Sequence, residues 1–163
     1  MKYYLIVFFS LLINHSFFSQ SIVIQSGGTN WSESLSSSTI TQAGADYTNN
    51  ITSSSNQSLI NVNGSLLTYQ VSVRRQDIVW DSRLQLFIRK TGDGTGGLLA
   101  TITPSGVSSY QQITTTNSNF FSGSLALLGN RVGVPIQYEI RGVSVLIPVK
   151  TYSTTIIYTV TGL

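Results

Sequence analysis

Two stretches decide the fold: VPIQYEIRG at residues 134–142 and YSTTIIYTVTG at residues 152–162. In both, one row of alternate positions is mainly apolar, namely Val134, Ile136, Tyr138 and Ile140, then Tyr152, Thr154, Ile156, Tyr158 and Val160. Successive side chains of a strand point to opposite faces, so each stretch has one apolar face and one mostly polar face. Both are therefore predicted to be half-buried strands, separated by a bend at Gly142.

Further alternating stretches occur along the chain. They comprise clear runs at 67–74, 84–89 and 98–102 and weaker strands near 21–25, 38–42, 57–62 and 110–115. The glycine-rich segment 91–97 offers the positive φ angles that turns need, which predicts a hairpin from Leu84 to Thr103. Gly129-Asn130 predicts a second, tight hairpin between strands at 125–128 and 131–134. Residues 117–123 are expected to form a loop.

No stretch repeats apolar residues at the three- and four-residue spacing of a helix. Eight or nine short strands with turn signals between them indicate an all-β protein, and specifically an immunoglobulin-like (Greek-key) antiparallel β-sandwich. Residues 21–163 are expected to form one such domain, because a chain of this length can bury a core without disulfides.

Residues 1–20 have the layout of a secretory signal peptide. Lys2 gives the basic start, residues 3–13 are almost continuously apolar, and small residues such as Ser19 and Ser21 surround the expected cleavage point. A permanent membrane-spanning helix needs about 20 apolar residues. The mature protein is therefore expected to be secreted or held at the cell surface, without a stable membrane span after cleavage. An uncleaved membrane anchor is the alternative.

Charged residues are scarce and cysteine is absent. The chain has nine basic and six acidic residues and a net charge of +3, which provides few cations for the phosphates of a nucleic acid. Its one histidine, His15, lies in the expected signal peptide. The mature chain thus lacks the thiol and imidazole groups of common nucleophile pairs and zinc sites. No catalytic, cofactor or metal site is expected.

Two carboxylates lie close enough in sequence to be considered as a catalytic pair, Asp77 and Asp81. Four residues of extended strand span about 13 Å, more than the roughly 5–9 Å between the carboxylates of a glycosidase. Ion pairs with Arg74, Arg75 or Arg83 are the favoured alternative. Asp93 lacks the neighbouring ligands of a calcium or phosphate loop and is interpreted as part of a hairpin tip.

Aromatic residues are better candidates for binding a ligand. Trp31 and Trp80 stand beside polar residues, and Phe87 falls on the polar face of its strand. Exposed aromatic rings on a hydroxyl-rich β surface suit stacking against sugar rings. These three residues are therefore candidate ligand-stacking residues, with burial in the core as the alternative.

The first expected strand is a candidate for strand exchange through Ile22, Val23 and Ile24. Cleavage would leave it at the new N-terminus, before Gly27-Gly28, and it is short enough to detach. A detached strand can pair with the open sheet edge of another chain. The alternative is that it forms the first strand of its own sheet.

The closing run IPVKTYSTTIIYTVT at residues 147–161 resembles the last strand of secreted bacterial pilin-like and spore-coat-U-like β-sandwich subunits. The strand at 134–142 has the place of their penultimate strand. The resemblance implies an immunoglobulin-like sandwich that serves as a surface or fibre subunit and assembles by strand exchange. It covers only these C-terminal strands, and the cysteine pair of many fimbrial subunits is absent.

Together, these observations predict an exported structural or adhesive cell-surface protein. A fibre- or fimbria-like subunit is one form that such a protein can take. It would associate with itself or with other surface proteins through edge strands. The alternative is a non-catalytic carbohydrate-binding β-sandwich whose partners are glycans.

Overall fold

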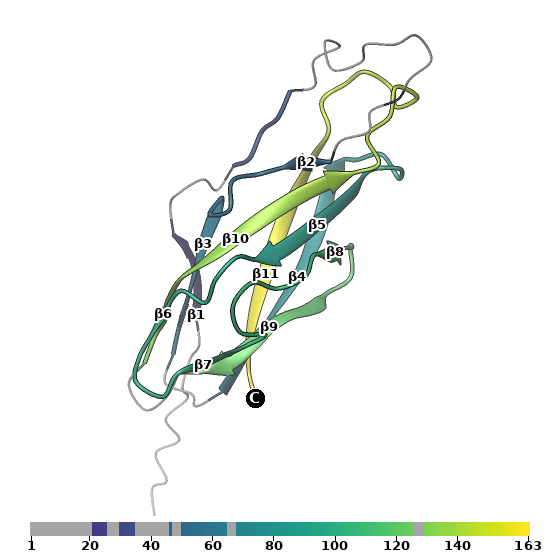
Figure 1. Ribbon diagram of the computed structural model, residues 1–163. Coiled ribbons are helices and arrows are strands. Elements are labelled where there is room, and N and C mark those ends of the chain that lie inside the picture. Colours follow the sequence, from purple (N-terminus) through teal and green to yellow (C-terminus); the bar gives the residue numbers. More distant parts are fainter. Residues whose placement is uncertain (1–20, 26–29, 35–45, 47–49, 65–67, 126–128) are drawn as a thin grey trace, which may run out of the picture.

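The computed structural model describes residues 21–25, 30–34, 46, 50–64, 68–125 and 129–163, and this part of the chain contains strands and no helix (Figure 1). The strands are β1 (Ser21–Gln25), β2 (Ile51–Thr52), β3 (Ser58–Asn63), β4 (Thr68–Val79), β5 (Gln85–Lys90), β6 (Thr95–Gly96), β7 (Thr101–Thr103), β8 (Gln111–Ile113), β9 (Ser118–Ser124), β10 (Arg131–Arg141) and β11 (Ser153–Gly162). The expected signal peptide, the expected strand at 38–42 and residues 126–128 lie outside the described residues. Within them, no helix is long and apolar enough to cross a membrane.

The strands form two antiparallel sheets. Sheet A has the order β1-β3-β10-β5-β8, and β2 and β6 also pair with β10. Sheet B has the order β11-β4-β9-β7. The prediction of an all-β protein with antiparallel sheets is therefore confirmed. The structure has more strands than expected, partly because β2 and β6 are two residues long and too short to leave an alternating pattern in the sequence.

Among the described strands, no two that follow each other in the chain pair with each other. The chain instead passes back and forth between the sheets. The predicted hairpin from Leu84 to Thr103 is wrong, because β5 pairs with β8 and β10 in sheet A while β7 pairs with β9 in sheet B. The predicted hairpin at Gly129-Asn130 is also wrong. At Arg131, β10 pairs with Val62 of β3 on one side and with Gly96 of β6 on the other, which leaves no side for a hairpin partner.

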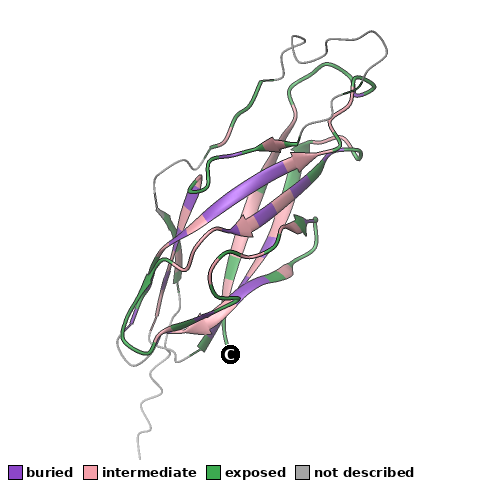
Figure 2. Ribbon diagram, in the orientation of Figure 1, coloured by how far each residue is buried: buried purple, intermediate pink, exposed green. Residues whose placement is uncertain are grey.

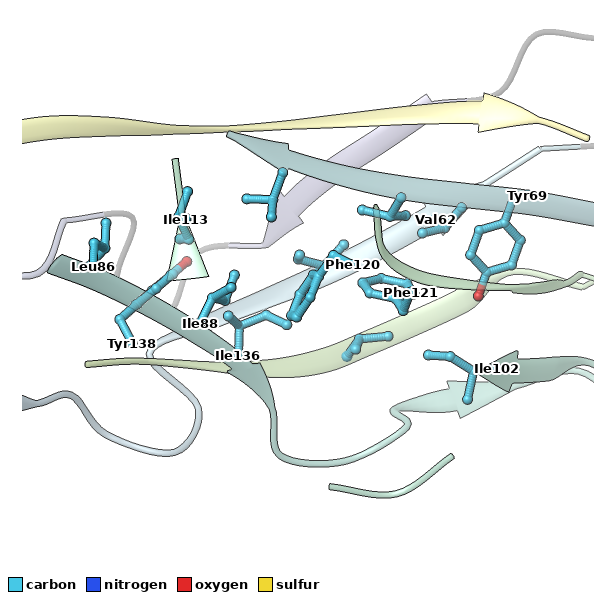
Figure 3. Packing of buried hydrophobic residues seen from close by; sticks show 14 of the residues in the cluster. Val62, Tyr69, Leu86, Ile88, Ile102, Ile113, Phe120, Phe121, Ile136 and Tyr138 are labelled. Carbon is cyan, nitrogen blue, oxygen red and sulfur yellow. The ribbon is translucent and has the colours of Figure 1, made fainter. Parts of the chain in front are cut away.

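One hydrophobic core lies between the sheets (Figures 2 and 3). Sheet A contributes alternate residues of β3, β5 and β10 and one residue of β8, namely Ile60, Val62, Leu86, Ile88, Ile113, Val134, Ile136 and Tyr138. Sheet B contributes residues of β4, β7 and β9, namely Tyr69, Val71, Val73, Ile102, Phe120 and Phe121. The alternation read from the sequence therefore points to the correct inward residues in β4, β5 and β10.

Residues 117–123 were expected to be a loop, but residues 118–123 belong to β9. Val71 of β4 pairs with Phe121 and the next residue, Ser72, pairs with Asn119, so Phe120 is an extra residue in the ladder. Such a β-bulge breaks the strict alternation of a strand. It allows Phe120 and Phe121 both to be buried, with ring centroids 5.3 Å apart. Because two neighbouring residues both point inward at the bulge, the sequence of this strand does not alternate and was not recognised as a strand.

Lys90 is fully buried, which is rare for a charged side chain unless it is paired. Its ammonium forms an ion pair with Asp93 and also donates to the carbonyl oxygens of Gly92, at 3.2 Å, and of Gly106. Asp93 accepts from the backbone N–H of Gly106 at 2.8 Å and from the hydroxyl of Ser105 at 3.1 Å. This Lys90–Asp93 clamp joins the glycine-rich loop to the turn before β8. Asp93 is therefore a cross-link between two loops and not the tip of a hairpin.

The clamp predicts a pH-dependent stability. Burial disfavours the ionised form of Asp93, but hydrogen bonds from Lys90 and Gly106 outweigh it and hold the pKa of Asp93 below its usual value. Asp93→Asn is expected to lower the free energy of unfolding by about 2–3 kcal/mol at neutral pH, because a buried ammonium loses its counter-ion. Since the folded pKa is depressed, this difference is present above the unfolded pKa of about 3.9 and closes as the pH falls through the folded value.

Denaturant unfolding of the two proteins across the acid range measures this difference. Asp77→Asn is the matched control, because Asp77 pairs with Arg75 near the surface and an exposed pair contributes at most about 1 kcal/mol. Equal stability of wild type and Asp93→Asn at neutral pH would contradict the clamp.

Candidate functional site

The two sheets leave a seam on the side where β1 is the edge of sheet A and β11 is the edge of sheet B. The two strands approach to within 8 Å between Cα atoms without pairing. A cavity of about 440 Å³ lies in this seam. Its walls come from β1, residues 30–32, β10, the segment 151–158 and Trp80, and we call it the seam cavity.

Trp31 and Trp80 line the same seam cavity, although they are far apart in the chain. The ring of Trp31 stacks on Tyr138, with centroids 6.2 Å apart and planes at 19°. The indole N–H of Trp31 donates to Glu33 Oε1 at 2.9 Å, and that of Trp80 donates to the carbonyl oxygen of Leu84 at 2.9 Å. Because both N–H groups have partners, the two indoles offer carbon surface to the cavity.

Phe87 lies elsewhere, and the structure does not bring it together with the two tryptophans. It projects from the outer face of sheet A, as its place on the polar face of its strand predicts, and it is half-buried. The guanidinium of Arg141 covers its ring, 3.9 Å from the centroid. Arg141 and Arg89 also lie over Tyr110, at 5.6 and 4.5 Å. Phe87 thus belongs to an arginine–aromatic cluster that occupies its face.

Tyr138 and Tyr158 join the two sheets beside the seam cavity. Their hydroxyl oxygens are 2.8 Å apart, and the Tyr138 hydroxyl also donates to Ser58 Oγ at 2.9 Å. Burial raises the pKa of both phenols, so both are protonated at neutral pH. The sequence placed each tyrosine on the apolar row of its strand. It gave no sign that the two strands oppose each other, so this pair was missed.

The candidate strand-exchange residues belong to β1, which pairs with β3 of its own chain. Ile22 lies opposite Val62 and Ile24 opposite Ile60. Ile22 packs against the core, Ile24 lines the seam cavity, and Val23 is exposed. The structure therefore has β1 as a strand of its own sheet, and its donation to another chain stays a prediction.

The carboxylates considered as a catalytic pair are each bound by an arginine. Asp77 pairs with Arg75, and both oxygens of Asp81 lie 2.8 Å from nitrogens of Arg83. The ion-pair interpretation is confirmed for both. In the ranges that the structure describes, no three His, Cys, Asp or Glu side chains gather where they would hold a metal ion.

Comparisons with models of protein families, with curated proteins and with solved structures gave no match for this chain. The ligand that the candidate site could bind is therefore inferred from the residues that line it. The lining of the seam cavity combines five aromatic side chains with hydroxyl groups and contains no charged residue. Such a lining suits a neutral ligand held by stacking and hydrogen bonds.

The tyrosine pair gives a prediction about stability. Tyr138→Phe is expected to lower the free energy of unfolding by about 1–3 kcal/mol, because the buried hydroxyl of Tyr158 loses its partner. Chemical denaturation measures the change. Tyr110→Phe is the control, since its hydroxyl bonds Gln137 Oε1 at 3.2 Å on the outer face of sheet A and should cost less. An equal loss of unfolding free energy in the two variants would show that the Tyr138–Tyr158 hydrogen bond stabilises the protein no more than the hydrogen bond of Tyr110 on the outer face.

Proposed function

We propose that this protein is an exported structural or adhesive protein of the cell surface that associates with further copies of itself through the edge of β11. One observation carries the proposal: β11 is ten residues long and contains neither a charged residue nor proline. Among the described strands it pairs only with β4. Its other edge presents backbone N–H and C=O groups that can accept a strand from another molecule.

The other sheet edges in the described part of the chain are much shorter. β7 and β8 have three residues each and β1 has five. Short strands, charges and proline are the usual means of keeping a sheet edge from pairing. β11 has none of these protections, which favours it as the edge that pairs.

Symmetry favours a second copy of the chain as the partner. Two β11 strands related by a twofold axis would pair antiparallel, with the same surface on both sides of the contact. The outward residues Thr155, Thr159 and Thr161 are exposed and would meet each other without bringing like charges together. Cross-strand threonine pairs contribute favourably to a sheet. The result would be one continuous sheet made from both copies of sheet B.

Two sequence features support export and a surface role. Residues 1–20 have the layout of a signal peptide, and the remaining chain relies on uncharged polar side chains for solubility. The resemblance of residues 134–161 to pilin-like subunits agrees with this role and stays a prediction.

For the finer topology, the order of pairing supports a jelly roll over the immunoglobulin-like arrangement expected from the sequence. In an immunoglobulin sandwich, several consecutive strands are neighbours in a sheet. Here the pairs are nested: β3 with β10, β4 with β9, and β5 with β8. Nesting of this kind arises when a long antiparallel ribbon is wound into two facing sheets, as in a jelly roll.

Thr159→Lys tests the association. It is expected to keep the protein monomeric, because a lysine on an edge strand opposes pairing with a second strand. Wild-type protein of residues 21–163 should show a mass that rises with concentration towards twice that of the monomer. Size-exclusion chromatography with light scattering, over a range of loading concentrations, measures both.

Thr115→Lys is the matched control, because it places the same charge at an exposed residue outside the strands and should associate like wild type. A chain starting at Gly27 separates the two edges. If this shorter chain is monomeric while Thr159→Lys still associates, the contact runs through β1 and the proposal is wrong. A wild-type protein that stays monomeric at every concentration also contradicts it.

A further inference from the structure

The aromatic walls of the seam cavity come from four separate parts of the chain. Trp31 and Trp80 lie outside the strands, Tyr138 belongs to β10, and Tyr152 and Tyr158 lie before and within β11. Side chains of this size usually fill a core, but here they surround a space of about 440 Å³. Ligand sites typically measure about 300–1,000 Å³.

The cavity carries no charge of its own. Glu33, beside it, accepts the Trp31 N–H, and Arg75, whose guanidinium lies 5.1 Å from the centre of the Trp80 ring, is paired with Asp77. The ammonium of Lys150 lies at the border, 5.1 Å from the centre of the Tyr152 ring, and is not part of the lining. Within the lining, a charged ligand would lose its hydration without contacting an opposite charge, which is costly. The lining therefore favours a neutral ligand over carboxylates, phosphates and amines.

Several polar groups of the lining are available to a ligand. In the part of the chain that the structure covers, the hydroxyls of Ser32, Thr151 and Ser153 and the carboxamide of Asn30 make no side-chain hydrogen bond within the protein. Each hydroxyl can both donate and accept. An aliphatic ligand would cover these groups without satisfying them.

We propose that the seam cavity binds a neutral pyranose ring, either as a single sugar or as one unit of a glycan. The C–H faces of a pyranose fit against aromatic carbon surface, and its hydroxyls pair with hydroxyls and amides. The site uses Trp31 and Trp80, two of the three residues that the sequence singled out, and leaves Phe87 out. It does not depend on association through β11.

Tryptophan fluorescence provides a direct test, because the chain has two tryptophans and both line this cavity. Wild-type protein of residues 21–163 is titrated with methyl β-D-glucopyranoside, methyl α-D-mannopyranoside, N-acetylglucosamine and cellobiose. At least one is expected to give a saturable change in emission. Glucuronic acid, which adds a charge to the same ring, is expected to bind at least about tenfold more weakly.

Ser32→Tyr and Thr151→Tyr each place a large side chain at the lining of the cavity, outside β11, and leave its aromatic walls in place. Both are expected to weaken binding of the responding sugar by about tenfold or more, and circular dichroism identifies a variant that has not folded. Phe87→Leu is the matched control on the outer face of sheet A and should bind like wild type. Thr159→Lys should also bind like wild type, which keeps this test separate from self-association.

Three outcomes would overturn the proposal. The first is that no neutral sugar changes the tryptophan emission. The second is that glucuronic acid binds as tightly as the neutral sugar that responds, which would contradict the preference for an uncharged ligand. The third is that Phe87→Leu loses as much affinity as the two cavity-filling variants, which would put the sugar on the outer face of sheet A.

Discussion

The pairing of β10 is the constraint on which the rest of the structure depends. Its ladder holds β2, β3, β5 and β6, so most of sheet A is attached through this one strand (Figure 1). The inward residues fill the core, and the outward residues Gln137 and Glu139 bind the chain around β2. Gln137 Nε2 donates to the carbonyl oxygen of Ser53 at 2.8 Å, and Glu139 accepts from Asn50 at 3.1 Å. The core covers one face of the strand and the chain around β2 covers the other, which explains why Gln137 and Glu139 are buried.

The seam follows from the same arrangement. With β10 inside sheet A and β4 and β9 inside sheet B, the strands left at one side are β1 and β11. Beside these edges, the Tyr138–Tyr158 hydroxyl pair connects β10 to β11, and no backbone ladder joins β1 to β11. A connection through side chains leaves space between the sheets, and that space is where Trp31 and Trp80 meet. The edge proposed to pair with a second copy and the cavity proposed to bind a sugar are therefore both consequences of how this side of the molecule remains open.

Alternation in the sequence predicted the inward residues of the long strands well, because the side chains that share one face of a strand lie two residues apart in the sequence. It predicted Val134, Ile136 and Tyr138 correctly. Pairing between strands is different: a turn signal such as Gly129-Asn130 reports local bending but not which distant strand will take the neighbouring edge. The bulge at Phe120 and the inward Lys90 were missed for a similar reason, since each breaks the local pattern and is stabilised by residues elsewhere. Likewise, the sequence identified Trp31 and Trp80 as separate candidates but not as neighbours.

The nested order of pairing also determines when the chain can fold. The ladders β1–β3, β5–β8 and β4–β9 lie within residues 21–124, whereas the ladders of β10 and β11, which join the parts of sheet A and complete sheet B, need the C-terminal quarter of the polypeptide. Chains dominated by distant contacts close large loops first and fold slowly. A chain that lacks its C-terminal quarter would accordingly have sheet A divided into two separate pairs of strands, β1 with β3 and β5 with β8. Under the proposed export, this late joining of sheet A would suit a chain that crosses a membrane before it folds.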